Sequence, residues 1–166
     1  MFVTDEQTDH PIDTDRWAQL ATHALAERGV RRGELSLTFV DEATIAELNA
    51  EHMGADGPTD VLSFPLDDGD DAAGTDPRVP VLLGDVVICP AVAAANAPAH
   101  AAGAVEPHPG HPTHDGSLGS ELSLLVVHGV LHVLGLDHAE PDETAEMHAA
   151  ERAILAGGAP SGSALR

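Results

Sequence analysis

Apolar and polar residues alternate along the chain in a pattern that predicts helices interleaved with short strands. Leu35, Leu37 and Phe39 alternate with Ser and Thr, which is typical of a strand with one buried face. An alanine-rich run precedes this strand, with Thr14 as the expected N-cap and Gly29 as the expected end. The first part of the chain therefore predicts a helix followed by a strand.

The rest of the chain continues this alternation. The predicted elements are a helix from Glu42 to Glu51 capped by Asp41, a strand over 61–64 ended by Pro65, a strand over 81–88 ended by Pro90, a weak helix over 91–102, a strongly apolar helix over 121–134 capped by Ser120, and a helix from Pro141 to Leu155. The stretches 67–77 and 103–119 are rich in polar residues and glycine or proline and are predicted loops. The interleaving predicts an α+β fold, with helices packed on a small mixed sheet.

Length and composition fit one small domain. The 166 residues predict a single domain over 1–156, followed by a disordered tail over 157–166. The single cysteine, Cys89, is expected at a buried strand end, and it excludes an internal disulfide bond. No apolar stretch is long enough to span a bilayer, and the first residues lack the pattern of a secretory signal. A cytoplasmic protein with no membrane partner is expected.

The charge of the chain is strongly one-sided. Seven basic residues, all arginines, face 28 acidic ones, which gives a formal net charge of −21. Such a charge favours solubility and repels polyanions at long range. Taken alone it disfavours a nucleic-acid partner, because affinity for DNA or RNA usually comes from lysine and arginine contacts with phosphates.

The most informative segment carries three histidines, His128, His132 and His138. Residues four apart on a helix differ by about 40° in azimuth and about 6 Å in height, so the first two project from one face. Gly135 is expected at the helix C-terminus, where a left-handed turn brings His138 toward them. Three neutral imidazoles leave one position open on a tetrahedral ion, as in catalytic zinc sites. The segment predicts a zincin-like site for one zinc ion, or another divalent transition metal such as nickel, at the end of a core helix.

The spacing of the three histidines is also that of the metzincin peptidases. In those enzymes a glutamate follows the first histidine and acts as general base, whereas this chain has Gly129. Met147, in the last predicted helix, does not resemble the methionine turn of that class. A peptidase is therefore disfavoured.

Three sequence blocks resemble the YbeY family of bacterial endoribonucleases, which mature ribosomal RNA. His128 to His138 is similar to the family signature H-G-x-L-H-x-x-G-x-D-H, residues 58–65 read P-T-D-V-L-S-F-P, and residues 84–88 are similar to its G-D-I-V-I strand. The resemblance implies an α+β domain whose three histidines hold zinc or another divalent ion. It further implies cleavage of single-stranded RNA in 16S ribosomal RNA 3′-end maturation and in ribosome quality control, with ribosomal RNA and the ribosome as partners and no DNA.

The chain departs from the family pattern at three places. Many members carry an arginine shortly before the P-T-D block, where this chain has Met53. A His-Ser pair often precedes the metal-binding helix, and Gly116-Ser117 stands there instead. The aromatic residue common before the Asp-His pair is replaced by Leu136.

Four further polar residues are candidates for the site. Asp60 and Ser63 lie in the second family block and are catalytic candidates, although a structural role in the strand explains them equally well. Glu121 is expected to act as a first-turn acid favoured by the helix dipole rather than as a base. Asp137 adjoins a histidine and either accepts an imidazole N–H or stabilises the turn.

Two further groups of charged or titratable residues stand apart from that segment. His108, His111 and His114 lie in a predicted loop and are expected to be solvated rather than to hold a metal tightly. Arg28, Arg31 and Arg32 form the only local basic group, and they are candidates for a phosphate contact or for an ordinary surface turn.

Three functions remain open from the sequence. The first is a metal-dependent endoribonuclease, the second a zinc peptidase without its usual base, and the third a non-catalytic, metal-stabilised ribosome-assembly factor. The open coordination position on the metal favours an enzyme, whereas the missing arginine is compatible with the third, non-catalytic function.

Overall fold

A four-stranded mixed sheet forms the centre of the fold. The computed structural model describes residues 1–66, 81–103 and 112–158. The strands are β1 (Phe2–Asp5), β2 (Glu34–Phe39), β3 (Val61–Pro65) and β4 (Leu82–Ile88), in the order β1-β2-β4-β3. β1, β2 and β4 run parallel, and β3 pairs antiparallel with β4. The predicted α+β class and the mixed sheet are confirmed.

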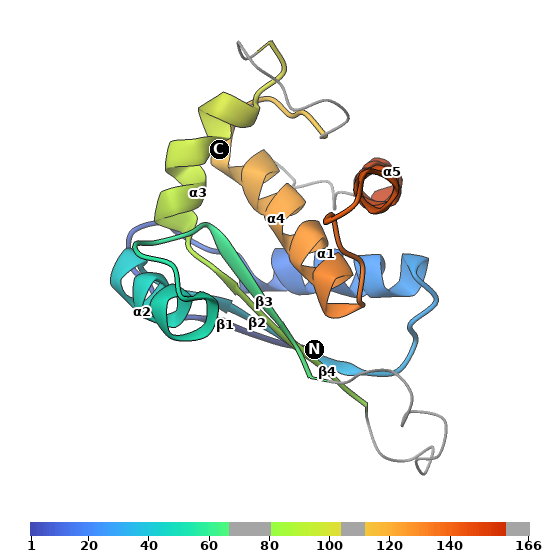
Figure 1. The fold of residues 1–166 in the computed structure, drawn as a ribbon, viewed down its shortest axis with the longest axis horizontal. Coiled ribbons are helices and arrows are strands. Elements are labelled where there is room, and N and C mark those ends of the chain that lie inside the picture. Colours follow the sequence, from blue (N-terminus) through green and yellow to red (C-terminus); the bar gives the residue numbers. More distant parts are fainter. Residues whose placement is uncertain (67–80, 104–111, 159–166) are drawn as a thin grey trace.

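Helices cover the two faces of this sheet unequally. The helices are α1 (Thr14–Glu27), α2 (Glu42–Met53), α3 (Pro90–Asn96), the 3-10 helix η1 (Ala97–His100), α4 (Leu118–Val133) and α5 (Pro141–Gly158). α1 and α4 lie on one face and α2 lies on the other (Figure 1). The alternation of β2 explains this division, because Leu35, Leu37 and Phe39 are buried in the larger core with α1 and α4.

α4 is the most deeply buried helix among the described residues, with eleven buried positions. Most of its surface is apolar, and it packs between the sheet, α1, α3 and α5. Gly129 allows α4 to approach the sheet closely, because a Cβ atom there would lie 2.5 Å from Cγ1 of Val86. The packing of this helix holds its two partly buried histidines in position.

The ends of three helices differ from the predictions. α1 is capped by Asp13, whose carboxylate accepts the N–H of Arg16, and not by Thr14. α4 begins at Leu118 and is capped by Ser117, whose hydroxyl accepts the N–H of Ser120, so the prediction of Ser120 as the cap was wrong. α5 continues to Gly158 instead of ending at Leu155. Residues 159–166 of the predicted tail lie outside the described part of the chain.

The remaining predictions of secondary structure agree with the structure in outline. Asp41 caps α2 as predicted, and its carboxylate accepts the N–H of Thr44 at 2.8 Å. β1 was missed, because a strand of four residues, only one of them not exposed, carries almost no alternating pattern. The predicted loop at 67–77 and residues 104–111 of the other loop lie outside the described residues. No helix within 1–66, 81–103 and 112–158 is long and apolar enough to cross a bilayer.

Candidate metal centre

The structure brings His128, His132 and His138 together at one end of α4. The ring centroids of His128 and His132 lie 4.6 Å apart, and that of His138 lies 5.7 and 5.0 Å from them. One ligand nitrogen from each ring lies within 4.8 Å of the other two. We call these residues the three-histidine cluster.

The turn after α4 places the third histidine of this cluster. Gly135 has φ near +90°, the left-handed conformation predicted for it. The N–H of Gly135 donates to the carbonyl of His132 and the N–H of Leu136 donates to that of Leu131, both at 3.0 Å, which is the hydrogen-bond pattern of a Schellman turn. The reversal returns the chain toward the end of the helix, so that His138 faces the other two rings.

A buried carboxylate, which the sequence analysis missed, orients the first of these histidines. Oε1 of Glu151 on α5 lies 2.7 Å from Nδ1 of His128, and the Glu151 side chain has no exposed surface. Since a carboxylate only accepts hydrogen bonds, Nδ1 of His128 carries the proton and Nε2 presents its lone pair. This contact selects the tautomer that binds a metal through Nε2.

The three rings have the chemistry that a divalent ion requires. Nε2 of His128 and Nε2 of His132 lie 3.1 Å apart, a distance at which one ring donates its N–H to the other or a bound cation accepts both lone pairs. Burial lowers the pKa of His132, and the neighbouring His128 and His138 lower it further. A depressed pKa keeps this imidazole neutral at pH 7, the form that ligates metals. The donor set therefore fits zinc or a similar transition ion.

A pocket of about 300 Å³ opens beside the cluster. Besides the three histidines, it is lined by Met53 from α2 and by Val61, Leu62, Ser63 and Pro65 from β3. Met53, at the position where an arginine was expected from the family resemblance, is 53% exposed. None of the described residues that line this pocket is cationic, so a bound ion would supply its only full positive charge.

The other candidates have mainly structural contacts. The hydroxyl of Ser63 donates to the carbonyl of Gly129 at 3.3 Å, which ties β3 to α4 at the wall of the pocket. Oδ2 of Asp60 accepts from Asn96 on α3 at 3.2 Å, and Asp60 is not among the described pocket-lining residues. Asp137 accepts the backbone N–H of His138 at 2.7 Å, as expected for a residue that stabilises the turn.

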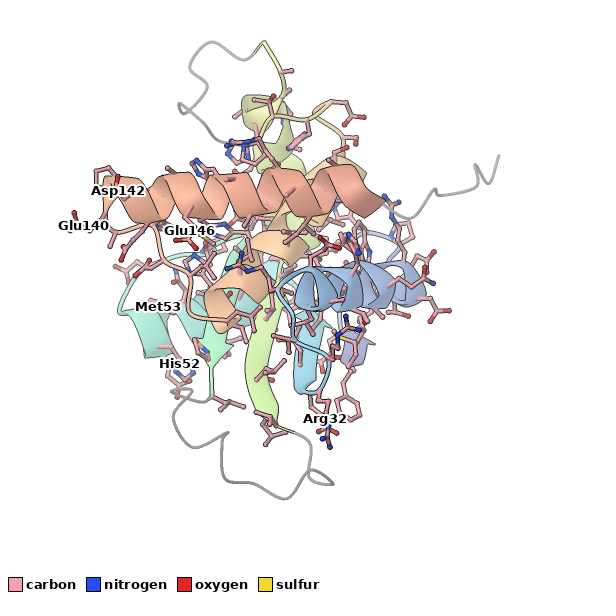
Figure 2. The ribbon with its side chains drawn as sticks, turned by 90° about the vertical axis from the view of Figure 1, so that its right-hand side faces the viewer. Arg32, His52, Met53, Glu140, Asp142 and Glu146 are labelled. Carbon is pink, nitrogen blue, oxygen red and sulfur yellow. The ribbon has the colours of Figure 1, made fainter. Side chains whose placement is uncertain are left out.

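None of the three arginines of the predicted basic group lines the pocket. Arg32 is well separated from Met53 (Figure 2), and Arg28 pairs with Glu146 at 3.8 Å. Glu140, Asp142 and Glu146 lie on the side of the molecule that carries Met53 (Figure 2). Cys89 is fully buried as predicted, and burial raises the pKa of its thiol.

One prediction about the polar residues near α4 needs correction, and another is confirmed. His114 was expected to be solvated, but only 11% of its side chain is exposed and its Nε2 lies 2.5 Å from Oε2 of Glu121. Glu121 lies in the first turn of α4 as predicted, and it is completely buried. His108 and His111 lie outside the described residues.

Comparison with known proteins identifies the family. The model of the family described as Endoribonuclease YbeY matches residues 2–158. The chain belongs to the YbeY endoribonuclease family.

Individual YbeY relatives cover most of the chain. The protein named Endoribonuclease YbeY from Salinispora tropica is 48% identical over 154 residues, which is 87% of each chain. The one from Thermobifida fusca is 45% identical over 148 residues, covering 89% of this chain and 86% of its own. The solution structure of TM1509 from Thermotoga maritima matches with a TM-score of 0.57 at 21% identity over 100% of this chain and 99% of that one, which supports the fold alone.

Proposed function

We propose that this chain is a metal-dependent endoribonuclease that cleaves single-stranded RNA, and that it acts in 16S ribosomal RNA 3′-end maturation and ribosome quality control in the cytoplasm. The observation that carries the proposal is the convergence of three imidazoles, one of them fixed by Glu151, at the wall of an open pocket. Membership of a family of endoribonucleases supports RNA as the substrate class.

The residues of the three-histidine cluster would hold one zinc ion, or another divalent transition metal, through neutral ring nitrogens. When bound, such an ion supplies Lewis-acid chemistry, since it polarises phosphoryl oxygens and lowers the pKa of water. Glu151 keeps Nδ1 of His128 protonated and thereby aims Nε2 at the ion. The wall formed by β3 and Met53 is largely apolar, so the ion would be the main group that interacts with a phosphate in the pocket.

Single-stranded RNA fits this site better than a duplex does. The pocket of about 300 Å³ lies at the edge strand β3, and a ring from the last turn of α4 forms part of its wall. A single strand can bend a phosphate into such a recess, whereas a rigid duplex exposes its backbone on a broad convex surface. We therefore place the scissile phosphate beside the three-histidine cluster.

The acidic surface has a measurable consequence for this function. With a formal net charge of −21 and acidic side chains on the side of the molecule that carries Met53 (Figure 2), the protein repels RNA at long range. Salt screens this repulsion, so the cleavage rate at subsaturating RNA should rise between low salt and about 0.15 M ionic strength. Docking on a ribosomal partner would compensate for the repulsion in the cell.

A non-catalytic assembly factor is the second candidate. The observation in its favour is Met53, because the described lining of the pocket contains no arginine or lysine to bind a phosphate. A zinc peptidase is less favoured, since Gly129 cannot take a proton and a larger side chain there would collide with Val86.

The deciding experiment compares cleavage of one RNA sequence as a single strand and as a duplex. Zinc-loaded wild type should cut the single strand, lose activity in EDTA and regain it when zinc returns, whereas His128→Ala should stay inactive. His10→Ala is the matched control, because His10 lies between β1 and α1, near the edge of the sheet opposite β3. A wild type that binds zinc tightly at the three-histidine cluster without cutting either RNA supports the assembly factor, and cleavage of casein supports the peptidase.

A further inference from the structure

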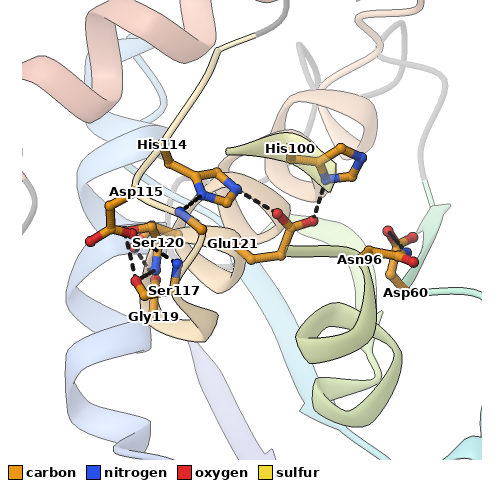
Figure 3. A network of polar contacts seen from close by, with 11 residues as sticks. Asp60, Asn96, His100, His114, Asp115, Ser117, Gly119, Ser120 and Glu121 are labelled. Atoms are coloured by element: carbon orange, nitrogen blue, oxygen red, sulfur yellow. Dashed lines mark hydrogen bonds and ion pairs between the residues drawn. The ribbon is translucent and has the colours of Figure 1, made fainter. Parts of the chain in front are cut away.

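A second group of histidines surrounds a buried carboxylate at the other end of α4. Oε1 of Glu121 lies 2.9 Å from Nδ1 of His100, and Oε2 lies 2.5 Å from Nε2 of His114 (Figure 3). We call these three residues the His-Glu-His cluster. The residues come from three separate segments, namely the end of η1, the strand-like segment before α4, and the first turn of α4.

The burial of Glu121 requires a strong compensating interaction. Its side chain has no exposed surface, while those of His114 and His100 are 11% and 34% exposed. Moving an ionised carboxylate out of water costs several kcal/mol even after the protein relaxes. The positive end of the helix dipole offsets only part of this cost, because a first-turn acid gains about 0.3–1 kcal/mol at an exposed position. Hydrogen bonds from the rings of His100 and His114 offset a further part, and a cation coordinated by the carboxylate would offset more.

The donor atoms form a recognised set for transition metals. Two imidazole nitrogens and one carboxylate oxygen lie within 4.8 Å of one another. Two histidines and one carboxylate bind zinc in several enzymes and also bind other divalent transition ions. Backbone hydrogen bonding preorganises the set, since the N–H of Ala102 donates to the carbonyl of His114 at 2.8 Å and thereby joins the segments of both histidines.

One hydrogen bond of His114 opposes metal binding and lowers the affinity of the cluster for a metal. Nδ1 of His114 accepts the N–H of Gly116 at 3.0 Å, so in this arrangement Nε2 carries the proton and donates to Glu121. Coordination through Nε2 requires that proton to move to Nδ1 and Gly116 to give up its bond. The three-histidine cluster has no such cost at His128, because Glu151 already holds that ring in the binding tautomer.

From these contacts we infer that His100, His114 and Glu121 form a second site for a divalent transition ion, weaker than the three-histidine site. Zinc bound there joins η1 and the segment at residue 114 to the first turn of α4. Its role is structural, since the ion closes the N-terminal end of the helix whose other end carries His128 and His132.

Zinc titration with measurement of bound metal tests the inference. Wild type should bind two equivalents of zinc. Glu121→Gln and His114→Ala should each keep only the tight equivalent, and His128→Ala should keep only the weaker one. Saturation of wild type at one equivalent, or retention of both equivalents by Glu121→Gln and His114→Ala, would overturn the proposal. Tight zinc binding and RNA cleavage report on the three-histidine cluster, whereas the second, weaker equivalent reports on the His-Glu-His cluster. The absence of the second equivalent would therefore refute the second site without refuting the proposed function.

Control variants and a check of folding keep the test decisive. His10→Ala should retain both equivalents, and circular dichroism should show that each variant is folded. His100→Ala, the most exposed member of the cluster, replaces Glu121→Gln if the latter does not fold. His108→Ala/His111→Ala should also retain both equivalents, and loss of one would overturn the assignment.

Nitrogen-15 spectra of the histidine rings give an independent readout. Without zinc, His114 should show the tautomer with the proton on Nε2, and with two equivalents of zinc it should show the proton on Nδ1. If the tautomer of His114 does not change at saturating zinc, His114 does not coordinate the ion, and hydrogen bonds alone hold the cluster together.

Discussion

The two histidine clusters of α4 contain similar residues but place their carboxylates differently. In the three-histidine cluster, Glu151 lies behind His128 and binds the nitrogen that points away from the other rings. In the His-Glu-His cluster, Glu121 lies between the two rings, and each of its carboxylate oxygens lies within hydrogen-bond distance of one ring nitrogen. A carboxylate behind a ring directs a lone pair toward the shared centre, whereas a carboxylate between rings directs protons there.

This difference matters for interpreting other histidine clusters. The distances between nitrogen and oxygen are alike in the two places, at 2.7 Å for Glu151 and 2.5 and 2.9 Å for Glu121. What separates them is the partner of the nitrogen that faces away from the shared centre, which is the carboxylate of Glu151 for His128 and the N–H of Gly116 for His114. The partner of the non-ligating nitrogen therefore decides how readily a cluster accepts a metal.

The largest expected effect comes from removing a ring of the three-histidine cluster. His132→Ala should lower kcat/KM for single-stranded RNA by at least about 10²–10³-fold, since an electrostatic stabiliser of the reaction is lost. Cleavage of a labelled oligonucleotide measures this loss. Activity within threefold of wild type would show that the cluster is not the reaction centre.

Replacing each buried glutamate by glutamine should have a smaller effect, and the two variants should differ in their affinity for zinc. Glu151→Gln should weaken the tight zinc site about 10–100-fold, as is typical when the partner of a metal-binding histidine is altered. Competition with a chromogenic chelator measures the constant. Glu121→Gln is the matched variant, and a loss of tight zinc affinity in it equal to that of Glu151→Gln would refute the distinction.

A positive charge at Met53 should improve the pocket. Met53→Arg places a guanidinium at an exposed position on the pocket wall, where it can pair with a phosphate. We expect kcat/KM for RNA to rise about tenfold, which corresponds to about 1.4 kcal/mol. Met53→Gln, which adds polarity without charge, is the control, and an equal gain in both variants would exclude a charge effect.

The smallest effect concerns Asp115, beside the His-Glu-His cluster (Figure 3). Hydrogen bonds from the side chain and backbone of Ser117, with a further contribution from Ser120, lower the pKa of this carboxyl from 3.8 to about 2. Because the folded pKa is the lower one, its stabilising contribution is present above about pH 4 and disappears as the pH falls through about 2.

Asp115→Asn tests this contribution directly. The variant should unfold at a lower denaturant concentration than wild type at pH 5, and the difference should shrink toward pH 2. Urea titrations at several pH values measure it. A difference that stays constant with pH would assign the effect to geometry rather than to ionisation.

The sequence predicted the three-histidine cluster because its information is local. His128 and His132 are one helical turn apart, and Gly135 marks the reversal that brings His138 back. The alternation of Leu35, Leu37 and Phe39 likewise predicted β2. In both cases the spacing along the chain fixes the geometry.

The partners of these residues were not predictable in the same way, because they come from distant segments. Glu151 lies 23 residues after His128, on another helix. A signal was present, since Met147, Glu151 and Ile154 share the buried face of α5 and only the glutamate is charged. Glu121 gives the same signal on the apolar α4, and an acidic residue on an apolar helix face therefore predicts a buried partner.

The parallel pairing of β2 with β4 has a consequence for the speed of folding. Leu35 pairs with Gly84 and Phe39 with Ile88, so the central pair of the sheet joins segments 49 residues apart. The chain must lose the conformational entropy of closing this long loop before it gains energy from the pairing of the strands, so such pairs form slowly. The helices that carry His128 and Glu151 are neighbours in sequence, but α4 needs the assembled sheet to cover its apolar face. We expect tight zinc binding to appear only in the slow, final phase of refolding.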